Sequence, residues 1–129
     1  MTYVLAYDIG TTGVKTCLFE IGSSITLLAG ESEGYNLYIL EDGGAEQDAD
    51  EWWTAMCCTT ERLLKRTGTP PEQIAGNLLL LPDAGTCADD ENGVPVHRPM
   101  SYMDQRAVEE IRKVSPTASK LPGLTSSSF

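Results

Sequence analysis

Residues 8–13 read Asp8-Ile9-Gly10-Thr11-Thr12-Gly13 and separate two strand-like runs of the sequence. The runs, Tyr3 to Tyr7 and Val14 to Ile21, are rich in the β-branched and aromatic residues that strands favour. A turn-rich segment of this length between two such runs predicts a β-hairpin. We therefore expect two antiparallel strands near the N-terminus, joined by a loop of glycine and threonine.

The same loop has the chemistry of a phosphate-binding site. Its two glycines let backbone N–H groups approach a polyphosphate closely, and its two threonines add hydroxyl donors. Lys15 supplies a positive charge for phosphate oxygens, and the carboxylate of Asp8 at the strand end suits hydrated Mg²⁺. The loop is not a Walker A motif, since no Gly-Lys-Ser/Thr follows and the chain continues into a strand. An ordinary Gly/Thr hairpin with an exposed lysine is the alternative interpretation.

A helix is predicted in the middle of the chain, after a third strand from Ser24 to Glu31. Asp48 is a good N-cap, and Glu51 follows it as in a capping box. Gly68 should end the helix. Apolar and small side chains repeat between these ends at helical spacing, namely Trp52, Met56, Thr59 or Thr60, and Leu63.

Fewer signals mark the last part of the chain. Glu91-Asn92-Gly93 predicts a hairpin turn, and Asp104 is placed to cap a last helix through Val108, Ile111 and Arg112. Together with the earlier elements, this order of strands and helices predicts a mixed α/β domain.

Composition and charge exclude several classes of protein. The 129-residue chain has a formal net charge of −10 and a sequence pI near 4.3, which argues against a nucleic-acid partner. No stretch approaches the ~20 apolar residues that span a bilayer, and no basic segment of a signal peptide precedes the first strand. We therefore expect a soluble, cytoplasmic protein without a membrane or nucleic-acid partner.

The cysteines and the single histidine give no sign of a metal site. Cys17, Cys57, Cys58 and Cys87 lack the spacing of metal ligands, so we expect reduced and mostly buried thiols. His97 lies in a polar stretch, which favours a surface position over a ligand role.

Three segments resemble the FGGY family of carbohydrate kinases, in that family's order and spacing. Tyr7 to Lys15 resembles the first phosphate motif of the family. Residues 46–53, Glu-Gln-Asp-Ala-Asp-Glu-Trp-Trp, resemble its Glu-Gln-Asp-Pro-x-x-Trp-Trp helix start and depart from it only at Ala49. Residues 90–106 resemble a third family segment, with Tyr102 in place of its tryptophan. The resemblance covers residues 3–113 and is closest to the xylulokinase subfamily.

The resemblance implies a ribonuclease H-like α/β fold of the actin/Hsp70 type, with residues 1–113 forming part of an N-terminal domain. It also implies phosphorylation of a pentulose such as xylulose, with ATP and Mg²⁺ bound in a cleft between two domains. Asp8 would then serve the metal, and Gly10, Thr11, Thr12, Gly13 and Lys15 would bind the phosphates. Asp104 and Arg106 would contact the sugar. The family's catalytic base would lie beyond Phe129, so no catalytic residue is assigned and the chain alone is expected to be inactive.

Two stretches do not fit the family order, and we interpret them as out of frame. Residues 77–89 stand where the family carries a sugar-contacting strand, Ile-Ser-Phe-Cys-Ser-Gln-Met-Gln-Gly. Dropping one base lets every codon from Asn77 to Gly85 encode that strand, and normal reading returns at Asp90. Residues 114–129 behave likewise under the opposite shift, so we expect a disordered tail and a premature stop after Phe129. A divergent loop followed by a disordered tail is the alternative.

Other functions compete with a kinase fragment. The chain could be a non-catalytic nucleotide-binding or interaction module of the actin-like superfamily, or a product that hardly folds because its apolar faces are uncovered. The segment from Glu46 to Trp53 favours the sugar kinases, because the actin and chaperone branches lack it. The sugar and the oligomeric state are left open.

Overall fold

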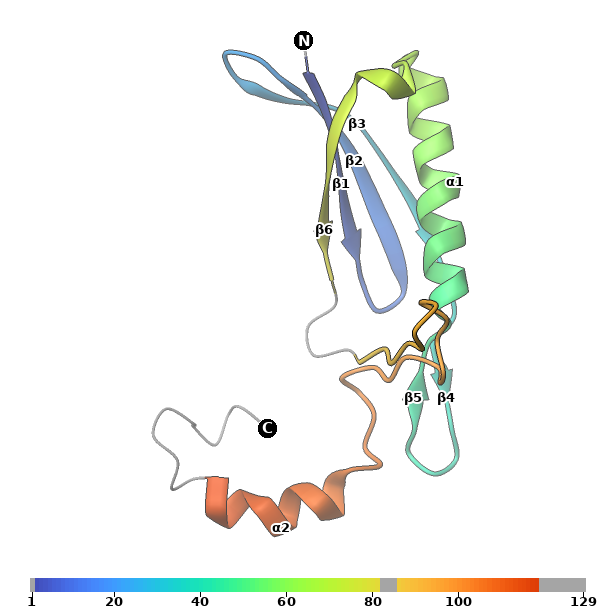
Figure 1. The fold of residues 1–129 in the computed structure, drawn as a ribbon, viewed down its shortest axis with the longest axis vertical. Coiled ribbons are helices and arrows are strands. Elements are labelled where there is room, and N and C mark those ends of the chain that lie inside the picture. Colours follow the sequence, from blue (N-terminus) through green and yellow to red (C-terminus); the bar gives the residue numbers. More distant parts are fainter. Residues whose placement is uncertain (1, 82–85, 119–129) are drawn as a thin grey trace.

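Four strands form the main sheet of the computed structural model, which describes residues 2–81 and 86–118 (Figure 1). They lie in the order β3–β2–β1–β6. Their bounds are Thr2–Ile9 for β1, Gly13–Ile21 for β2, Ile25–Gly34 for β3 and Ile74–Leu80 for β6. β1, β2 and β3 pair antiparallel, and β6 pairs with β1 in parallel. The predicted hairpin and third strand are confirmed.

Helix α1 (Ala49–Thr67) covers one face of the sheet and begins and ends where the sequence predicts. The carboxylate of Asp48 accepts a hydrogen bond from the N–H of Asp50 at 2.9 Å, which caps the first turn. At the other end Gly68 has a φ of 67°, a left-handed conformation that glycine adopts without steric cost.

The core lies between α1 and the sheet face that α1 covers. Its buried members come from β1, β2 and α1, and they are Leu5, Tyr7, Ile9, Val14, Leu18, Ala55 and Leu63. Two hydroxyl pairs also join the helix to the sheet, Thr16 with Thr59 and Tyr7 with Thr60, each at 2.7 Å. Because these buried hydroxyls have partners, they fix the helix on the sheet without leaving polar groups unsatisfied.

Glu51 does not complete the predicted capping box. Its carboxylate accepts hydrogen bonds from the backbone N–H of Asn36 at 2.8 Å and from the hydroxyl of Tyr38 at 2.7 Å. These bonds, from Tyr38 first and then from Asn36, lower the pKa of Glu51. Glu51 thus ties the start of α1 to the chain that follows β3.

The opposite face of the sheet is not covered by a helix in the part of the chain that the structure describes (Figure 1). Side chains from the three strands β1, β2 and β6 line a shallow apolar hollow of about 170 Å³ there. Strand β6, reached from α1 through a short 3-10 turn (Pro71–Gln73), is one of the two edge strands of this sheet. Its Leu78 and Leu80 are 64% and 65% exposed.

A small second layer lies beyond the end of the sheet. It consists of the hairpin of β4 (Tyr38–Ile39) and β5 (Ala45–Glu46), with the segment 86–106 alongside (Figure 1). The N–H of Ser101 donates to the carbonyl of Ala45 at 2.8 Å. The predicted turn is present in this segment, since the Asp90 carboxylate accepts from the N–H groups of Asn92 and Val94.

Helix α2 (Val108–Ala118) stands apart from the sheet in Figure 1. It begins at Val108, and the carboxylate of Asp104 bonds elsewhere, so the prediction that Asp104 caps this helix is wrong. Residues 114–118, predicted as the start of a disordered tail, are helical, and the rest of that tail lies outside the described residues. Within the described residues, no helix is long and apolar enough to cross a membrane.

All four cysteines are free, but the prediction that they are mostly buried is wrong. Cys57, Cys58 and Cys87 are exposed, and Cys17 is half-buried. On α1 the core is reached by Ala55, Thr59 and Leu63, so the two adjacent cysteines point away from it.

Candidate functional site

The β1–β2 hairpin places Asp8 and Lys15 opposite each other. The strand register pairs Asp8 with Lys15 and Ile9 with Val14, and paired residues of antiparallel strands share a face. Ile9 and Val14 are buried toward α1, so Asp8 and Lys15 lie on the open face of the sheet. Both are exposed, and neither forms an ion pair with another described residue.

A groove of about 340 Å³ extends from this pair to the end of β3. We call it the Lys15 groove, and its lining residues are Asp8, Thr12, Gly13, Val14, Lys15, Ser32, Glu33 and Gly34. It combines one amine with hydroxyls and the carboxylate of Asp8, a set that can bind an anion together with a hydrated cation.

Most of the residues predicted for phosphate and metal come together in this groove. Thr12, Gly13, Lys15 and Asp8 line it, whereas Gly10 and Thr11 belong to the same loop but lie outside the lining. The hydroxyl of Ser32 and the backbone of Glu33, whose carboxylate instead pairs with Arg62 on the α1 side of the sheet, were not predicted. Nothing in the sequence distinguishes them from ordinary residues of a strand, and only the pairing of β2 with β3 brings them to the site.

Gly13 is required by the packing of the strands. A Cβ at this position would lie 2.5 Å from the carbonyl oxygen of Glu33, a distance at which something must shift. Gly10 and Gly13 are not among the described glycines with positive φ, so neither glycine uses the left-handed conformation that often forms an anion-binding nest. Because Gly13 has no side chain, β3 can pack closely against the hairpin, where its residues form one side of the groove.

Two residues outside the loop hold its carbonyl groups. The hydroxyl of Tyr35 donates to the carbonyl of Gly10 at 2.5 Å, and its backbone N–H donates to that of Thr12 at 3.2 Å. The side-chain amide of Gln47 donates to the carbonyl of Thr11 at 2.6 Å. Burial, with a further contribution from the nearby charge of Asp8, raises the pKa of Tyr35 to about 12. Tyr35 therefore stays a neutral hydroxyl donor at physiological pH.

The chemistry of the groove fits a metal that arrives with a ligand. Among the described residues, no group of three or more His, Cys, Asp or Glu side chains could hold a metal ion by itself. Mg²⁺ keeps several waters and is usually bound by one or two carboxylates together with phosphate oxygens. The exposed carboxylate of Asp8 meets that smaller requirement.

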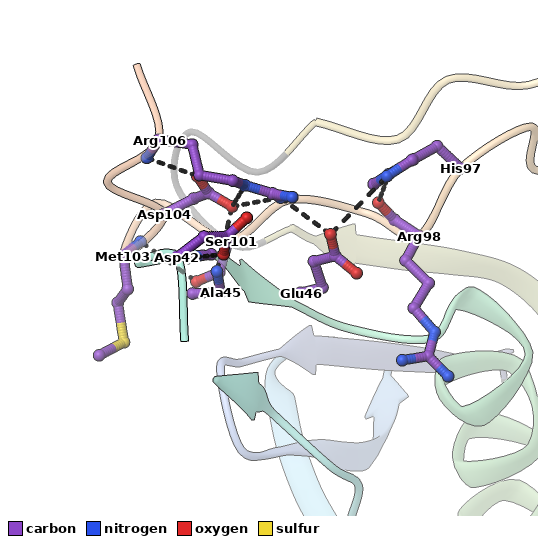
Figure 2. A network of polar contacts seen from close by, with 10 residues as sticks. Asp42, Ala45, Glu46, His97, Arg98, Ser101, Met103, Asp104 and Arg106 are labelled. Carbon is purple, nitrogen blue, oxygen red and sulfur yellow. Dashed lines mark hydrogen bonds and ion pairs between the residues drawn. The ribbon is translucent and has the colours of Figure 1, made fainter. Parts of the chain in front are cut away.

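Asp104 and Arg106, the residues predicted to contact the sugar, lie in a different cluster, which Figure 2 shows. We call Glu46, Asp104 and Arg106 the Arg106 cluster. The guanidinium of Arg106 donates from Nε and Nη2 to the Asp104 carboxylate at 3.0 Å and 2.6 Å, and Nη2 also lies 2.9 Å from Oε1 of Glu46. Asp104 in turn accepts from the backbone N–H of Ala45 at 3.0 Å.

These contacts set the protonation of the Arg106 cluster. Hydrogen bonds from the Arg106 guanidinium, against the opposing effect of desolvation, hold the pKa of Asp104 well below its usual range. The pKa of Arg106 is raised, first by its bonds to Asp104. Glu46 is only 6% exposed. The cluster therefore joins the 101–106 segment to β5, and the substrate role of Asp104 and Arg106 stays a prediction.

His97 lies at the edge of the Arg106 cluster. Its Nε2 is 3.7 Å from Oε1 of Glu46, and its side chain is 56% exposed. The predicted surface position of His97 is confirmed.

Known proteins match this chain over most of its length. The N-terminal domain of the FGGY family of carbohydrate kinases matches residues 3–122. A glycerol kinase from Rippkaea orientalis is 34% identical over 107 residues, covering 81% of this chain and 21% of that protein. A gluconokinase from Bacillus subtilis is 32% identical over 106 residues, covering 82% of this chain and 20% of that protein.

Solved structures show the same fold. The ligand-bound xylulose kinase from Lactobacillus acidophilus superposes with a TM-score of 0.78 at 19% identity, over 92% of this chain and 23% of that one. The described residues thus form a partial α/β domain of the actin/Hsp70-like type, as the resemblance implied. The chain spans about a fifth of the length of the curated relatives it matches.

Proposed function

Because this chain belongs to the FGGY family of carbohydrate kinases, we propose that its Lys15 groove binds the phosphates of Mg-ATP for phosphorylation of a sugar hydroxyl. The observation that carries the proposal is the convergence of Lys15, Thr12 and Asp8 on one open groove. An exposed lysine and carboxylate without partners in the described chain are available to a ligand. An ordinary Gly/Thr hairpin does not require this arrangement.

Each side chain has a distinct role in this proposal. The ammonium of Lys15 offsets the charge of phosphate oxygens, and the Thr12 hydroxyl and loop N–H groups donate hydrogen bonds to them. The carboxylate of Asp8 binds Mg²⁺ or a water of its hydration shell. Phosphoryl transfer depends mainly on positioning and charge stabilisation, and the groove contributes both. We assign no base within these residues.

We further propose a pentulose such as xylulose as the phosphate acceptor. The sequence motifs are most similar to those of xylulokinases, and a xylulose kinase is among the structures with this fold. Glycerol kinase and gluconokinase are among the relatives, so the shared acceptor chemistry is a polyol hydroxyl. Arg106 offers a contact for such a group, because its Nη1 has no hydrogen-bond partner among the described residues.

The residues at the end of β6 indicate whether the chain can bind a sugar beside the Lys15 groove. Leu80 pairs with Asp8, so β6 ends beside the Lys15 groove, where leucine side chains offer a sugar no hydrogen bond. This supports our proposal that residues 77–89 are out of frame and that the parental strand ended in Gln-Met-Gln. The same proposal extends to residues 114–129. The DNA sequence of the locus checks it, and shifted frames that meet stop codons would contradict it.

The leucines of β6 offer a sugar no hydrogen bond, and they therefore also favour a second candidate function, a non-catalytic nucleotide-binding module. In that case the chain binds Mg-ATP but phosphorylates no sugar. The purified chain alone should give no sugar-dependent ADP release under either function, because no base is assigned within it. ADP release from the protein made with its reading frame restored would exclude the module, and its absence would favour the module.

The proposed phosphate site is tested by replacing its positively charged side chain, Lys15. Lys15→Met keeps the length of the side chain and removes its charge. We expect Mg-ATP affinity, measured by isothermal titration calorimetry, to fall about tenfold, the equivalent of about 1.4 kcal/mol. The matched control is Lys65→Met on α1, which removes a lysine far from the groove lining and should leave affinity unchanged. Equal affinity for the two variants would overturn the proposal.

A further inference from the structure

The loop between β1 and β2 is held by its carbonyl groups. Three consecutive carbonyl oxygens, those of Gly10, Thr11 and Thr12, each accept a hydrogen bond from Tyr35 or Gln47. A trans peptide group is planar, so its N–H points away from its C=O. None of the described peptide bonds is cis, and the bonds to Gly10 and Thr11 therefore orient the N–H groups of Thr11 and Thr12 in the opposite direction.

These two N–H groups have no acceptor within the described residues. The tyrosine that holds the loop packs against the core on the side of the sheet that α1 covers. Asp8 and Lys15 lie on the other face, as the strand register shows. The free N–H groups of the loop consequently point toward the face where the Lys15 groove opens.

Tyr35 and Gln47, which bond the loop carbonyls, are themselves fixed by further contacts. Gln47 is 3% exposed, and its backbone N–H donates to the carbonyl of Pro99 at 2.9 Å. Tyr35 follows β3 directly, and its backbone and hydroxyl bonds fix it at two points. A shielded donor that lost its acceptor would be left without a hydrogen bond, which is unfavourable, so neither residue readily releases the loop.

We propose that Tyr35 and Gln47 are positioning residues of the phosphate site, which hold the loop so that the N–H groups of Thr11 and Thr12 face phosphate oxygens. The inference rests on the proposed binding of Mg-ATP. Without these contacts a peptide group can rotate and present its carbonyl oxygen, which repels phosphate. A hydrogen bond to the carbonyl also polarises the peptide and strengthens its N–H as a donor.

The test compares two tyrosine hydroxyls in the full 129-residue chain. Tyr35→Phe removes the donor to Gly10, and Tyr38→Phe removes a hydroxyl that donates to Glu51 instead. Inorganic tripolyphosphate and Mg-ATP serve as probes in calorimetric titrations. A net hydrogen bond of about 0.5–1.5 kcal/mol predicts a loss of about twofold to tenfold in affinity for Tyr35→Phe, and no change for Tyr38→Phe.

A second variant and a spectroscopic measurement distinguish positioning from general stability. Gln47→Glu replaces the donor to Thr11 by an acceptor and should also weaken tripolyphosphate binding. In ¹⁵N–¹H spectra the amide signals of Thr11 and Thr12 should shift downfield when tripolyphosphate binds the wild-type chain, and less in Tyr35→Phe. A loss of stability alone would leave both the affinity of the folded variant and these shifts unchanged.

The outcomes separate this inference from the proposed function. Wild-type chain that binds neither probe overturns the phosphate site and, with it, the inference. Wild-type chain that binds, together with Tyr35→Phe and Gln47→Glu variants that bind equally well, overturns the inference alone.

Discussion

The Lys15 groove and the Arg106 cluster both gather charges of opposite sign, but they use them differently. In the Arg106 cluster the guanidinium bonds two carboxylates of the chain, and one of these also accepts a backbone N–H. In the groove, Asp8 and Lys15 face each other across two strands, yet neither forms an ion pair with a described residue. The two regions therefore separate charges that hold the fold from charges that remain available to a ligand.

The difference has an energetic meaning. Removing one partner from a shielded, hydrogen-bonded ion pair leaves the other charge uncompensated, which is costly. An exposed charge without a partner contributes little to folding, so its removal costs little. Stability measurements on matched variants test whether the two regions differ in this way.

The largest effect should come from Arg106→Met. It leaves Asp104 and the nearly buried Glu46 without their cation. Breaking a buried pair is strongly destabilising, and because the Arg106 side chain is 29% exposed we expect a smaller but still clear fall of the urea midpoint below that of the wild type. Urea unfolding followed by tryptophan fluorescence measures the change.

The control for Arg106→Met is Arg112→Met. Arg112 forms an exposed pair with Glu109 on α2, and its loss should cost less than about 0.5 kcal/mol. If the two variants unfolded at the same urea concentration, the Arg106 cluster would not be the structural element that we describe.

A smaller effect should appear in the dependence of stability on pH. The folded pKa of Asp104 lies below the value of an unfolded aspartate, about 3.9, because Arg106 stabilises the carboxylate. Its stabilising contribution is therefore complete above that pH and is lost as the pH falls toward the folded pKa. Asp104→Asn should flatten the decline of stability below about pH 4 relative to wild type.

Urea midpoints collected across the acid range check the prediction for Asp104. The exposed Glu109→Gln variant serves as reference and should keep the wild-type slope. If Asp104→Asn lost stability with falling pH as steeply as the wild type, other carboxyl groups would be responsible for the loss of stability in acid.

The smallest effect is expected in the groove. Asp8→Asn should change the free energy of unfolding by less than about 0.5 kcal/mol, because Asp8 is exposed and has no ion-pair partner among the described residues. The same urea titration measures it. A loss above about 1 kcal/mol would place Asp8 among the structural charges and remove the contrast between the two regions.

The parts of the fold that could be predicted depend on neighbours in sequence. The turn between β1 and β2, the N-cap at Asp48, the left-handed Gly68 and the turn after Asp90 were all predicted correctly. Each depends on a local backbone requirement that a few residue types satisfy. The groove was predicted in part, because Asp8 and Lys15 flank the same turn.

The parts that could not be predicted depend on long-range pairing. The parallel pairing of β6 with β1 leaves no periodic signal in a run of leucines exposed on both faces. Glu51 bonds Asn36 and Tyr38 where a local capping box was expected. Tyr35 and Gln47 reach the loop through its main-chain carbonyls, which every sequence possesses, so their contacts have no residue signature.

The exposed edge of β6 also affects how the chain behaves at different concentrations. Its outer N–H and C=O groups and its uncharged side chains from Ile74 to Leu80 are the features on which strands of separate molecules pair. The rate of such pairing rises with the square of the chain concentration, whereas the folding of a single chain is first order. Dilution therefore favours the folded monomer, and crowding at high expression favours association through this strand.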